Sequence, residues 1–318
     1  MAALQTLFTY VGIGVVAYYI SVALTLLYDV FLRQGARLEK FGAGRGAWAI
    51  VTGCTDGLGR ETALELARRK FNILLISRSQ EKLTAMAEEI RQLGVEAHTL
   101  VVDFAQTTAD DWTRIQQEID AHFVGVLVNN VGASYDHPMF VEEVDPVALD
   151  RMVDLNVRAM IKMTTLTLPQ MKQRRVGLIV NNGSFAALQP SPFLAAYSGT
   201  KAFVKCFSQS VAAEVAPFNI TVEHLQTYFV CTQMTKMRRP TFFIPLPKPY
   251  IKCVFNKIGV QGGSSEPFTS VPFMPHALMA FVAERVVPKQ LGISYNYRLL
   301  AGLRKRALKK KEREAQQK

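Results

Sequence analysis

Tyr197 and Lys201 are the two residues of this sequence whose types and spacing most directly suggest chemistry. Residues four apart share one face of a helix, so a helical segment here would make the phenol and the ammonium group neighbours. A free tyrosine has a pKa of about 10, and a nearby cation favours the phenolate and lowers that value. Ser184 could hold a substrate oxygen while Tyr197 gives or takes the proton, and Asn156 could anchor a water relay. A single Tyr-x-x-x-Lys also arises by chance, so the pair needs a context.

A glycine-rich turn near the start of the chain supplies part of that context. A predicted strand over residues 47–53 runs into the sequence Gly-Cys-Thr-Asp-Gly-Leu-Gly, which opens a predicted helix. Glycines at such a turn let the backbone approach a pyrophosphate, and the helix N-terminus supplies amide donors. We therefore expect a dinucleotide to be bound by Gly53, Thr55, Asp56, Gly57, Leu58 and Gly59.

The residues that follow the next strands bear on the choice of cofactor. An enzyme that selects NAD usually carries Asp or Glu about twenty residues after the turn, whereas this chain has Arg78 nineteen residues after Gly59. Arg78 could pair with a 2′-phosphate, which predicts NADPH; the alternative is an exposed arginine that starts a helix. Asp103 could accept from the adenine amino group and Asn130 could shape the cofactor floor, although either could be purely structural.

Strands and helices are expected to alternate through the middle of the chain. Apolar runs rich in Val, Ile and Leu predict strands at 47–53, 72–78, 97–103, 124–130, 177–182 and 220–226. Helices are predicted at 57–70, 80–93, 108–122, 146–171 and 195–216. Buried strands that alternate with helices predict an α/β fold, a Rossmann-type doubly wound parallel sheet.

The N-terminus predicts a transmembrane helix. Residues 1–28 carry no charged side chain. A helix of this length is long enough to cross a hydrocarbon core of about 30 Å. A cleaved signal peptide fits poorly, because the run lacks a basic start and is too long. Basic residues follow the run and none precedes it, so the positive-inside rule places the next domain in the cytosol.

The C-terminus is strongly basic. Residues 304–318 hold eight Lys or Arg against two Glu, a net +6 of the chain's +11. Such a tail could bind nucleic acid or anionic lipid, or could simply be solvated. Behind an apolar anchor we favour a membrane surface and expect no nucleic-acid partner. The four cysteines lie far apart, which favours a reducing compartment.

Taken together, the motifs resemble the short-chain dehydrogenase/reductase superfamily over about residues 46–235. The resemblance rests on Thr52–Gly59, Asn129–Gly132, Asn156, Ser184, Tyr197 and Lys201. It implies that Asn156, Ser184, Tyr197 and Lys201 form a catalytic tetrad, and that Tyr197 and Lys201 also contact the cofactor. The superfamily usually has a Pro-Gly pair after the sixth strand, where this chain instead reads Gln226-Thr227-Tyr228-Phe229-Val230-Cys231-Thr232. Val230 and Thr232 are our candidates for contacts to the nicotinamide carboxamide.

That departure, together with the anchor and the basic tail, is similar to the microsomal very-long-chain 3-oxoacyl-CoA reductases, relatives of the 17β-hydroxysteroid dehydrogenases. The resemblance implies NADPH-dependent reduction of 3-oxoacyl-CoA to (3R)-3-hydroxyacyl-CoA in fatty-acid elongation at the endoplasmic reticulum membrane. It implies acyl-CoA as substrate and the condensing enzyme, dehydratase and enoyl reductase as partners, and it leaves oligomerisation open. The alternatives are a hydroxysteroid or retinoid dehydrogenase with the same tetrad, or a non-catalytic nucleotide-binding scaffold in a membrane complex.

The expected organisation has four parts: a membrane anchor at 1–32, a basic linker at 33–46, a catalytic domain at 47–290 and a basic tail at 291–318. Within the catalytic domain, residues 233–275 are rich in proline and apolar side chains, which predicts either a substrate lid or an interfacial segment. Arg238, Arg239 and Lys248 could meet the phosphates of CoA. The five histidines lack metal-ligand spacing, so no metal site is expected.

Overall fold

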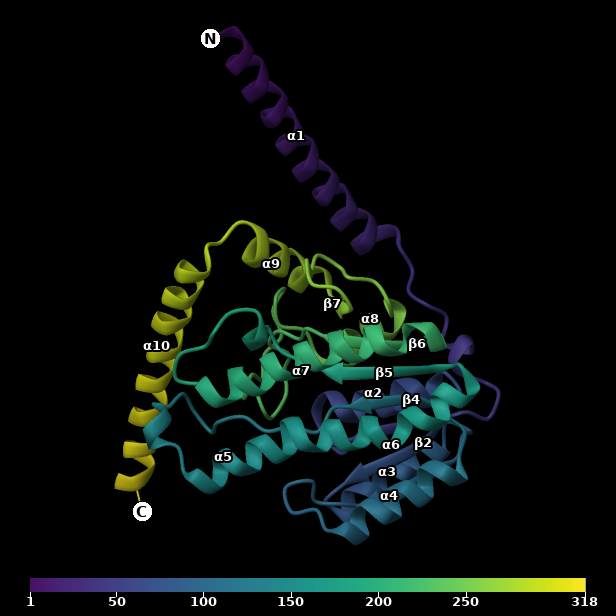
Figure 1. The fold of residues 1–318 in the computed structure, drawn as a ribbon. Helices are drawn as coiled ribbons and strands as arrows, with labels where there is room; N and C mark the ends of the chain where they lie inside the picture. The colour runs from purple at the N-terminus through teal and green to yellow at the C-terminus, as the bar shows by residue number, and fades with distance from the viewer. Residues whose placement is uncertain (318) are drawn as a thin grey trace.

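A seven-stranded, all-parallel sheet forms the centre of the computed structural model, which describes residues 1–317 (Figure 1). The spatial order is β3-β2-β1-β4-β5-β6-β7, so the strand order reverses between β1 and β4. The strands are Trp48–Thr52 (β1), Asn72–Ser77 (β2), Ala97–Val101 (β3), Val124–Asn129 (β4), Gly177–Asn182 (β5), Ile220–Leu225 (β6) and Thr269–Ser270 (β7). The predicted Rossmann-type doubly wound sheet is confirmed, and the reversal creates the crevice in which such folds bind ligands.

Helices cover both faces of the sheet. One apolar core packs Gly57–Arg68 (α2), Gln80–Arg91 (α3) and Pro247–Asn256 (α8) against one face. A second core packs Ala109–Ala121 (α4), Ala159–Arg174 (α6) and Ala195–Val215 (α7) against the other. Because both faces are covered, the central strands are apolar throughout rather than alternating; every side chain of β1 and β4 is buried.

The long helix predicted over 146–171 is built differently in the structure. It consists of Pro146–Val153 (α5), a π-helical turn at Asp154–Arg158 and then α6. The wider turn lies where Asn156 faces the interior, and π turns within helices often mark functional sites. A pattern of apolar residues does not reveal such a local change in winding, which is why the prediction missed it.

The N-terminal helix Ala2–Leu27 (α1) extends away from the rest of the molecule (Figure 1). Continued to Leu32 by a π turn, it is long and apolar enough to cross a membrane. Residues 33–46, the expected linker, are not loose: Leu38 and Phe41 are buried in the core beside β4. The backbone of Phe41 lies so close to Gly125 that a side chain there would overlap it.

The C-terminal segment, expected as a solvated or membrane-bound tail, forms a long helix instead. Met274–Arg285 (α9) leads into Lys289–Gln316 (α10), which runs down the side of the molecule past the end of α5 (Figure 1). Tyr297 packs on Phe193 with ring centroids 5.1 Å apart, and Arg304 pairs with Glu143 at 2.6 Å. These docking residues are dispersed among many charges, so composition alone did not reveal them.

Replacing Phe41 with Ala tests whether residues 33–46 belong to the folded core. The ring is fully buried, and truncating such a side chain typically costs about 3–5 kcal/mol. We expect a clearly lower Tm for the detergent-solubilised full chain. Phe242→Ala is the control, because that ring is 61% exposed and its loss should leave Tm almost unchanged. Equal small shifts in the two variants would contradict the packing described here.

Candidate active site

The glycine-rich turn is built by backbone conformations that other residues rarely adopt. Gly53 has φ of 63° and Gly57 has φ of 55°, both in the left-handed region. A Cβ at Gly59 would overlap the Gly53 carbonyl oxygen, so the first turn of α2 lies directly against the end of β1. Asp56 caps α2 by accepting from the Gly57 amide at 2.7 Å, and the Thr55 hydroxyl is 3.1 Å from that of Ser77.

This turn fits a dinucleotide. The N-terminus of α2 provides free amide groups and the positive end of the helix dipole, beside glycines that leave room for a pyrophosphate. Thr232, predicted to lie on the nicotinamide side, stands over this helix start: its Cγ2 is 3.4 Å from the position of a Cβ on Gly57. The structure thus brings the loop after β6 onto the predicted phosphate site.

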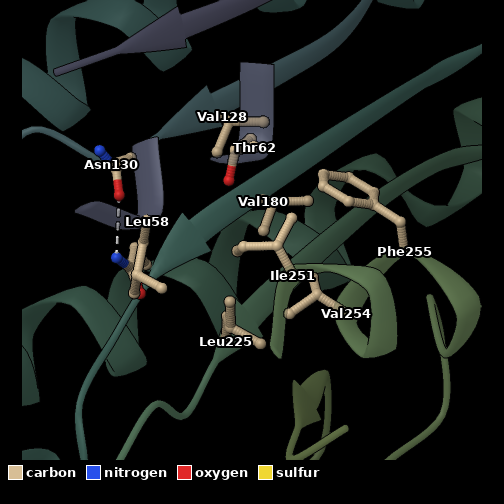
Figure 2. A pocket seen from close by; sticks show the side chains of 10 residues that line it. Leu58, Thr62, Val128, Asn130, Val180, Leu225, Ile251, Val254 and Phe255 are labelled. Carbon is tan, nitrogen blue, oxygen red and sulfur yellow. Dashed lines mark hydrogen bonds between the residues drawn. The ribbon is translucent and has the colours of Figure 1, made fainter. Parts of the chain in front are cut away.

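Asn130 ties the turn to the neighbouring strand. Its side-chain amide donates to the carbonyl oxygens of Thr52 and Gly53, both at 3.0 Å, and its Oδ1 accepts from Asn182 at 3.1 Å. Figure 2 shows this last bond at the rim of a small apolar hollow lined by Leu58 and Val128 among others. At about 10 Å³ the hollow holds about one water molecule, so it is a packing gap rather than a substrate site.

Asn156 joins the loop after β4 to α7. Its Nδ2 donates to the Ala133 carbonyl and to the Thr200 hydroxyl, each at 3.0 Å, while its Oδ1 accepts from the Ala133 amide at 2.7 Å. Both amide hydrogens and the oxygen therefore have protein partners. The geometry supports a positioning role for Asn156, in addition to any part in a water relay.

Lys201 and Tyr197 share one face of α7, as the spacing predicted. The Lys201 Nζ lies 5.9 Å from the centre of the Tyr197 ring and donates to the Asn182 carbonyl oxygen at 2.8 Å. Burial lowers the pKa of Lys201 to about 8. Burial also raises the pKa of Tyr197, opposed by a hydrogen bond with Ser184. The lowered tyrosine pKa expected from the sequence is therefore not seen here, because desolvation of the phenolate outweighs the hydrogen bond with Ser184.

Three residues of the site were not singled out from the sequence. The Oδ1 of Asn182, whose carbonyl holds Lys201, accepts from the Thr227 hydroxyl at 3.0 Å, and that hydroxyl accepts from the Tyr250 hydroxyl at 3.0 Å. Thr227 belongs to the 226–232 segment in which this chain lacks the superfamily's Pro-Gly pair. The sequence therefore showed the departure, but it did not show the hydrogen-bond partners of Thr227. Tyr250 comes from α8, which only the tertiary structure brings beneath this point.

The other predicted cofactor-binding residues lie in the segments that follow β2, β3 and β6. Arg78 is exposed directly after β2 and, among residues 1–317, forms no ion pair. Asp103 lies two residues beyond β3, which ends earlier than predicted, and its Oδ1 accepts from the Ala105 amide at 3.0 Å. Val230 is buried in the core and its carbonyl oxygen accepts from the Thr235 hydroxyl, which also accepts from the Thr232 amide. Both Val230 and Thr232 stay predictions as contacts to the nicotinamide carboxamide.

The segment between β4 and α5 is clamped from two sides. Asp136 pairs with Lys236 of the expected lid at 2.5 Å and with Lys311 of α10 at 3.3 Å. These two ammonium groups hold the pKa of Asp136 at about 2. Arg304 secures the same segment by its ion pair with Glu143. The 233–275 segment and α10 therefore both hold the segment between β4 and α5 by ion pairs.

Three of the five histidines lie near residues of the site: His137 is 3.6 Å from Asp136, His276 packs on Tyr228 with ring centroids 5.5 Å apart, and His224 lies beside Gly183. His224 is buried beside Gly183, and burial lowers its pKa to about 3, so it is neutral. His98 and His122 meet near Glu118 at the start of β3, which is the opposite edge of the parallel sheet from the glycine turn. The fold thus brings His98 and His122, which are distant in the sequence, close to each other at a place outside the candidate active site.

Comparison with known proteins gives the family. Residues 47–241 match the family model described as short chain dehydrogenase. The chain belongs to the short-chain dehydrogenase family. A relative from Laccaria bicolor is 42% identical, covering 96% of this chain and 90% of its own, and one from Coprinopsis cinerea is 41% identical, covering 92% and 87%. Both are named very-long-chain 3-oxoacyl-CoA reductase.

Solved structures of this family share the fold. A short-chain dehydrogenase from Sphingobium yanoikuyae, solved in complex with NADPH, superposes with a TM-score of 0.60 at 24% identity, covering 65% of this chain and 82% of its own. At this identity the likeness supports the fold alone. The family assignment rests on the sequence matches, which extend beyond the sheet into both ends of the chain.

The buried ammonium of Lys201 predicts a pH-dependent stability. Its pKa is about 8 in the folded chain against 10.5 for the free group, so between these values the unfolded state binds more protons and stability rises with pH. We expect the unliganded protein to gain up to about 1.4 kcal/mol per pH unit from about pH 8 to 10. Lys201→Met should be more stable than wild type at neutral pH and should lack this slope.

The measurement is the urea concentration at the midpoint of unfolding, for the wild type and for Lys201→Met, across this pH range. Lys162→Met, at an exposed position of α6, is the matched control and should keep the wild-type slope. A Lys201→Met protein that retains the full slope would show that another group is responsible.

Proposed function

We propose that this protein is a membrane-bound, NADPH-dependent reductase that converts long-chain and very-long-chain 3-oxoacyl-CoA to (3R)-3-hydroxyacyl-CoA in microsomal fatty-acid elongation. The observation that carries the proposal is the 41–42% identity to relatives of that name over more than nine-tenths of this chain. The match to the Laccaria bicolor relative leaves out only 4% of this chain, so it reaches into the apolar N-terminus and spans the region after β6.

The proposed catalytic residues are Asn156, Ser184, Tyr197 and Lys201. NADPH held at the glycine turn would supply the hydride that reaches the 3-oxo carbon. The Ser184 hydroxyl would hold the carbonyl oxygen, and Tyr197 would donate a proton to that oxygen as negative charge develops on it. The Lys201 ammonium stabilises the phenolate that remains, and Asn182 fixes the position of Lys201.

Several other residues would bind the cofactor in this proposal. The turn residues Gly53, Thr55, Asp56, Gly57, Leu58 and Gly59 surround the pyrophosphate, with Asn130 beneath them. Asp103 would lie at the adenine side, and Val230 and Thr232 would lie at the nicotinamide side. Arg78, exposed and unpaired among the described residues, favours NADPH because a free guanidinium after β2 suits a 2′-phosphate.

The proposed location is the endoplasmic reticulum membrane, with the catalytic domain in the cytosol. Residues 1–32 would be the anchor, 33–46 the connection, 47–290 the catalytic domain and 291–318 the basic C-terminal tail. The basic flank after α1 supports this orientation by the positive-inside rule. Other elongation enzymes are the proposed partners, since each consumes or supplies an acyl-CoA of this pathway.

Tyr197→Phe tests the proposed reaction. Phe keeps the ring but removes the proton donor, and general acid catalysis is typically worth about 10²–10⁴-fold in kcat. With NADPH and a long 3-oxoacyl-CoA, we expect a loss of that size and unchanged cofactor binding. Parallel assays with ketosteroid and retinoid substrates decide between the proposal and the alternative dehydrogenases. A wild-type protein inactive with every carbonyl substrate would instead favour a nucleotide-binding scaffold.

Arg78→Asp tests the choice of cofactor. The change removes a phosphate partner and adds a repulsive charge, so the ratio of kcat/KM with NADPH to kcat/KM with NADH should fall at least about 10-fold. Arg298→Asp, at an exposed position of α10, makes the same charge change away from the turn and should leave the ratio unaltered. An unchanged ratio for Arg78→Asp would place the selectivity elsewhere.

A further inference from the structure

A groove of about 590 Å³ lies beside the turn that follows α1, apart from the glycine turn. Its size is within the range of about 300–1,000 Å³ that is usual for pockets that bind small molecules. Its walls come from the turn after α1, the 233–275 segment and the start of α9. Side chains that line it include Val30, Phe242, Leu246, Cys253, Phe273 and Met274.

The end of α1 is fastened to the segment that forms this groove. Lys257 Nζ donates to the carbonyl oxygens of Asp29 at 2.8 Å and Arg33 at 2.5 Å. The Gly35 amide donates to the Asn256 carbonyl at 2.9 Å. The one ammonium group in the groove wall is thus directed at the backbone of the anchor, and the groove itself remains apolar. With α1 in a bilayer, these contacts hold the groove at the membrane surface.

Exposed apolar side chains flank the groove on both sides. Phe242 and Leu246 are 61% and 47% exposed on the lid, and Leu278 and Val282 are 41% and 47% exposed on α9. Soluble surfaces rarely gather so many large apolar side chains, and such groups next to an anchor suit contact with lipid. Figure 1 shows α9 and the lid on the side of the molecule from which α1 departs.

Packed aromatic rings lie between the groove and the catalytic residues. Phe273, in the groove wall, packs on His276 with ring centroids 4.9 Å apart, and His276 packs on Tyr228 at 5.5 Å. Tyr228 in turn packs on Phe185 at 5.0 Å, and Phe185 directly follows Ser184. The groove and the carbonyl-binding side of the site therefore lie on opposite sides of one apolar layer.

We propose that this groove binds the distal hydrocarbon part of a long 3-oxoacyl thioester, which reaches it from the bilayer. The inference rests on the proposed function, because it places the tail of that substrate relative to its reacting carbonyl. The anchor contributes Val30 to the groove wall, so binding of the tail and membrane attachment occur at one place. Each methylene buried there changes affinity about 4-fold.

The first test fills the groove. Cys253→Trp places a large ring in its wall, and Cys206→Trp makes the same change at an exposed position of α7. With NADPH and the full chain in nanodiscs, kcat/KM is measured for 3-oxobutyryl-CoA and for 3-oxo-octadecanoyl-CoA. We expect Cys253→Trp to lose at least about 10-fold on the long substrate and little on the short one, and Cys206→Trp to resemble wild type. Equal effects on both substrates in a folded Cys253→Trp protein would overturn the proposal.

The second test needs neither a variant nor turnover. Cys253 is half-buried in the groove, whereas Cys206 is exposed, so maleimide labelling of the wild-type protein can be followed at both by peptide mass spectrometry. A long acyl-CoA should slow labelling of Cys253 and not of Cys206, while CoA alone should slow neither. Absence of protection at Cys253 would overturn the groove proposal. Protection without reduction of any 3-oxoacyl-CoA would instead refute the proposed function and leave the groove as a lipid-binding site.

Discussion

The contact on which this molecule most depends is the bond between the Asn130 side chain and the backbone at the end of β1. One amide group satisfies the carbonyls of Thr52 and Gly53 and so holds β1 and β4 together where the strand order reverses. That reversal opens the crevice, and the glycine turn beside it can then approach a pyrophosphate. Removing these bonds would take one donor from each of two carbonyl groups at the point where the cofactor must be positioned.

The same network extends from the cofactor floor to the catalytic lysine. Asn182 bonds to Asn130 through its side chain and holds Lys201 through its carbonyl, while Thr227 fixes the other side of its amide. A buried ammonium is unfavourable, as its lowered pKa indicates, and such a group persists only where surrounding contacts hold it. The site therefore keeps a destabilising charge next to Tyr197, where it is useful to the proposed proton transfer.

Segments outside the sheet pack around this hydrogen-bond network. The 233–275 segment and α10 meet at Asp136, and α10 adds the pair between Arg304 and Glu143. On another side, the Gly35 and Ala36 amides, which follow the N-terminal helix, donate to the carbonyl oxygens of Asn256 and Ile258 at the end of α8, whose Tyr250 supports Thr227. The N-terminal segment, α8 and the catalytic network are thus connected by a short series of direct contacts. In the proposed function, with α1 as the membrane anchor, this arrangement holds the proposed groove close to the bilayer.

The sequence by itself determined six of the seven strands of the sheet, the order of the elements along the chain and the family; the short β7 was not predicted. Buried parallel strands need continuous apolar runs, and a glycine turn needs glycines at given positions, so both leave local patterns that can be read directly. The spacing of Tyr197 and Lys201 likewise placed them on one helical face, because helical geometry acts over four residues.

Only the tertiary structure decided what depends on contacts between distant segments. Asn182, Thr227 and Tyr250 come from three separate elements, and no spacing in the sequence joins them. The direction of the Tyr197 pKa depends on burial, which a list of neighbours along a helix does not contain. The docking of α10 and the groove beneath α1 were missed for the same reason: charge and apolar composition describe a segment, whereas its partner is set by the folded surface that it meets.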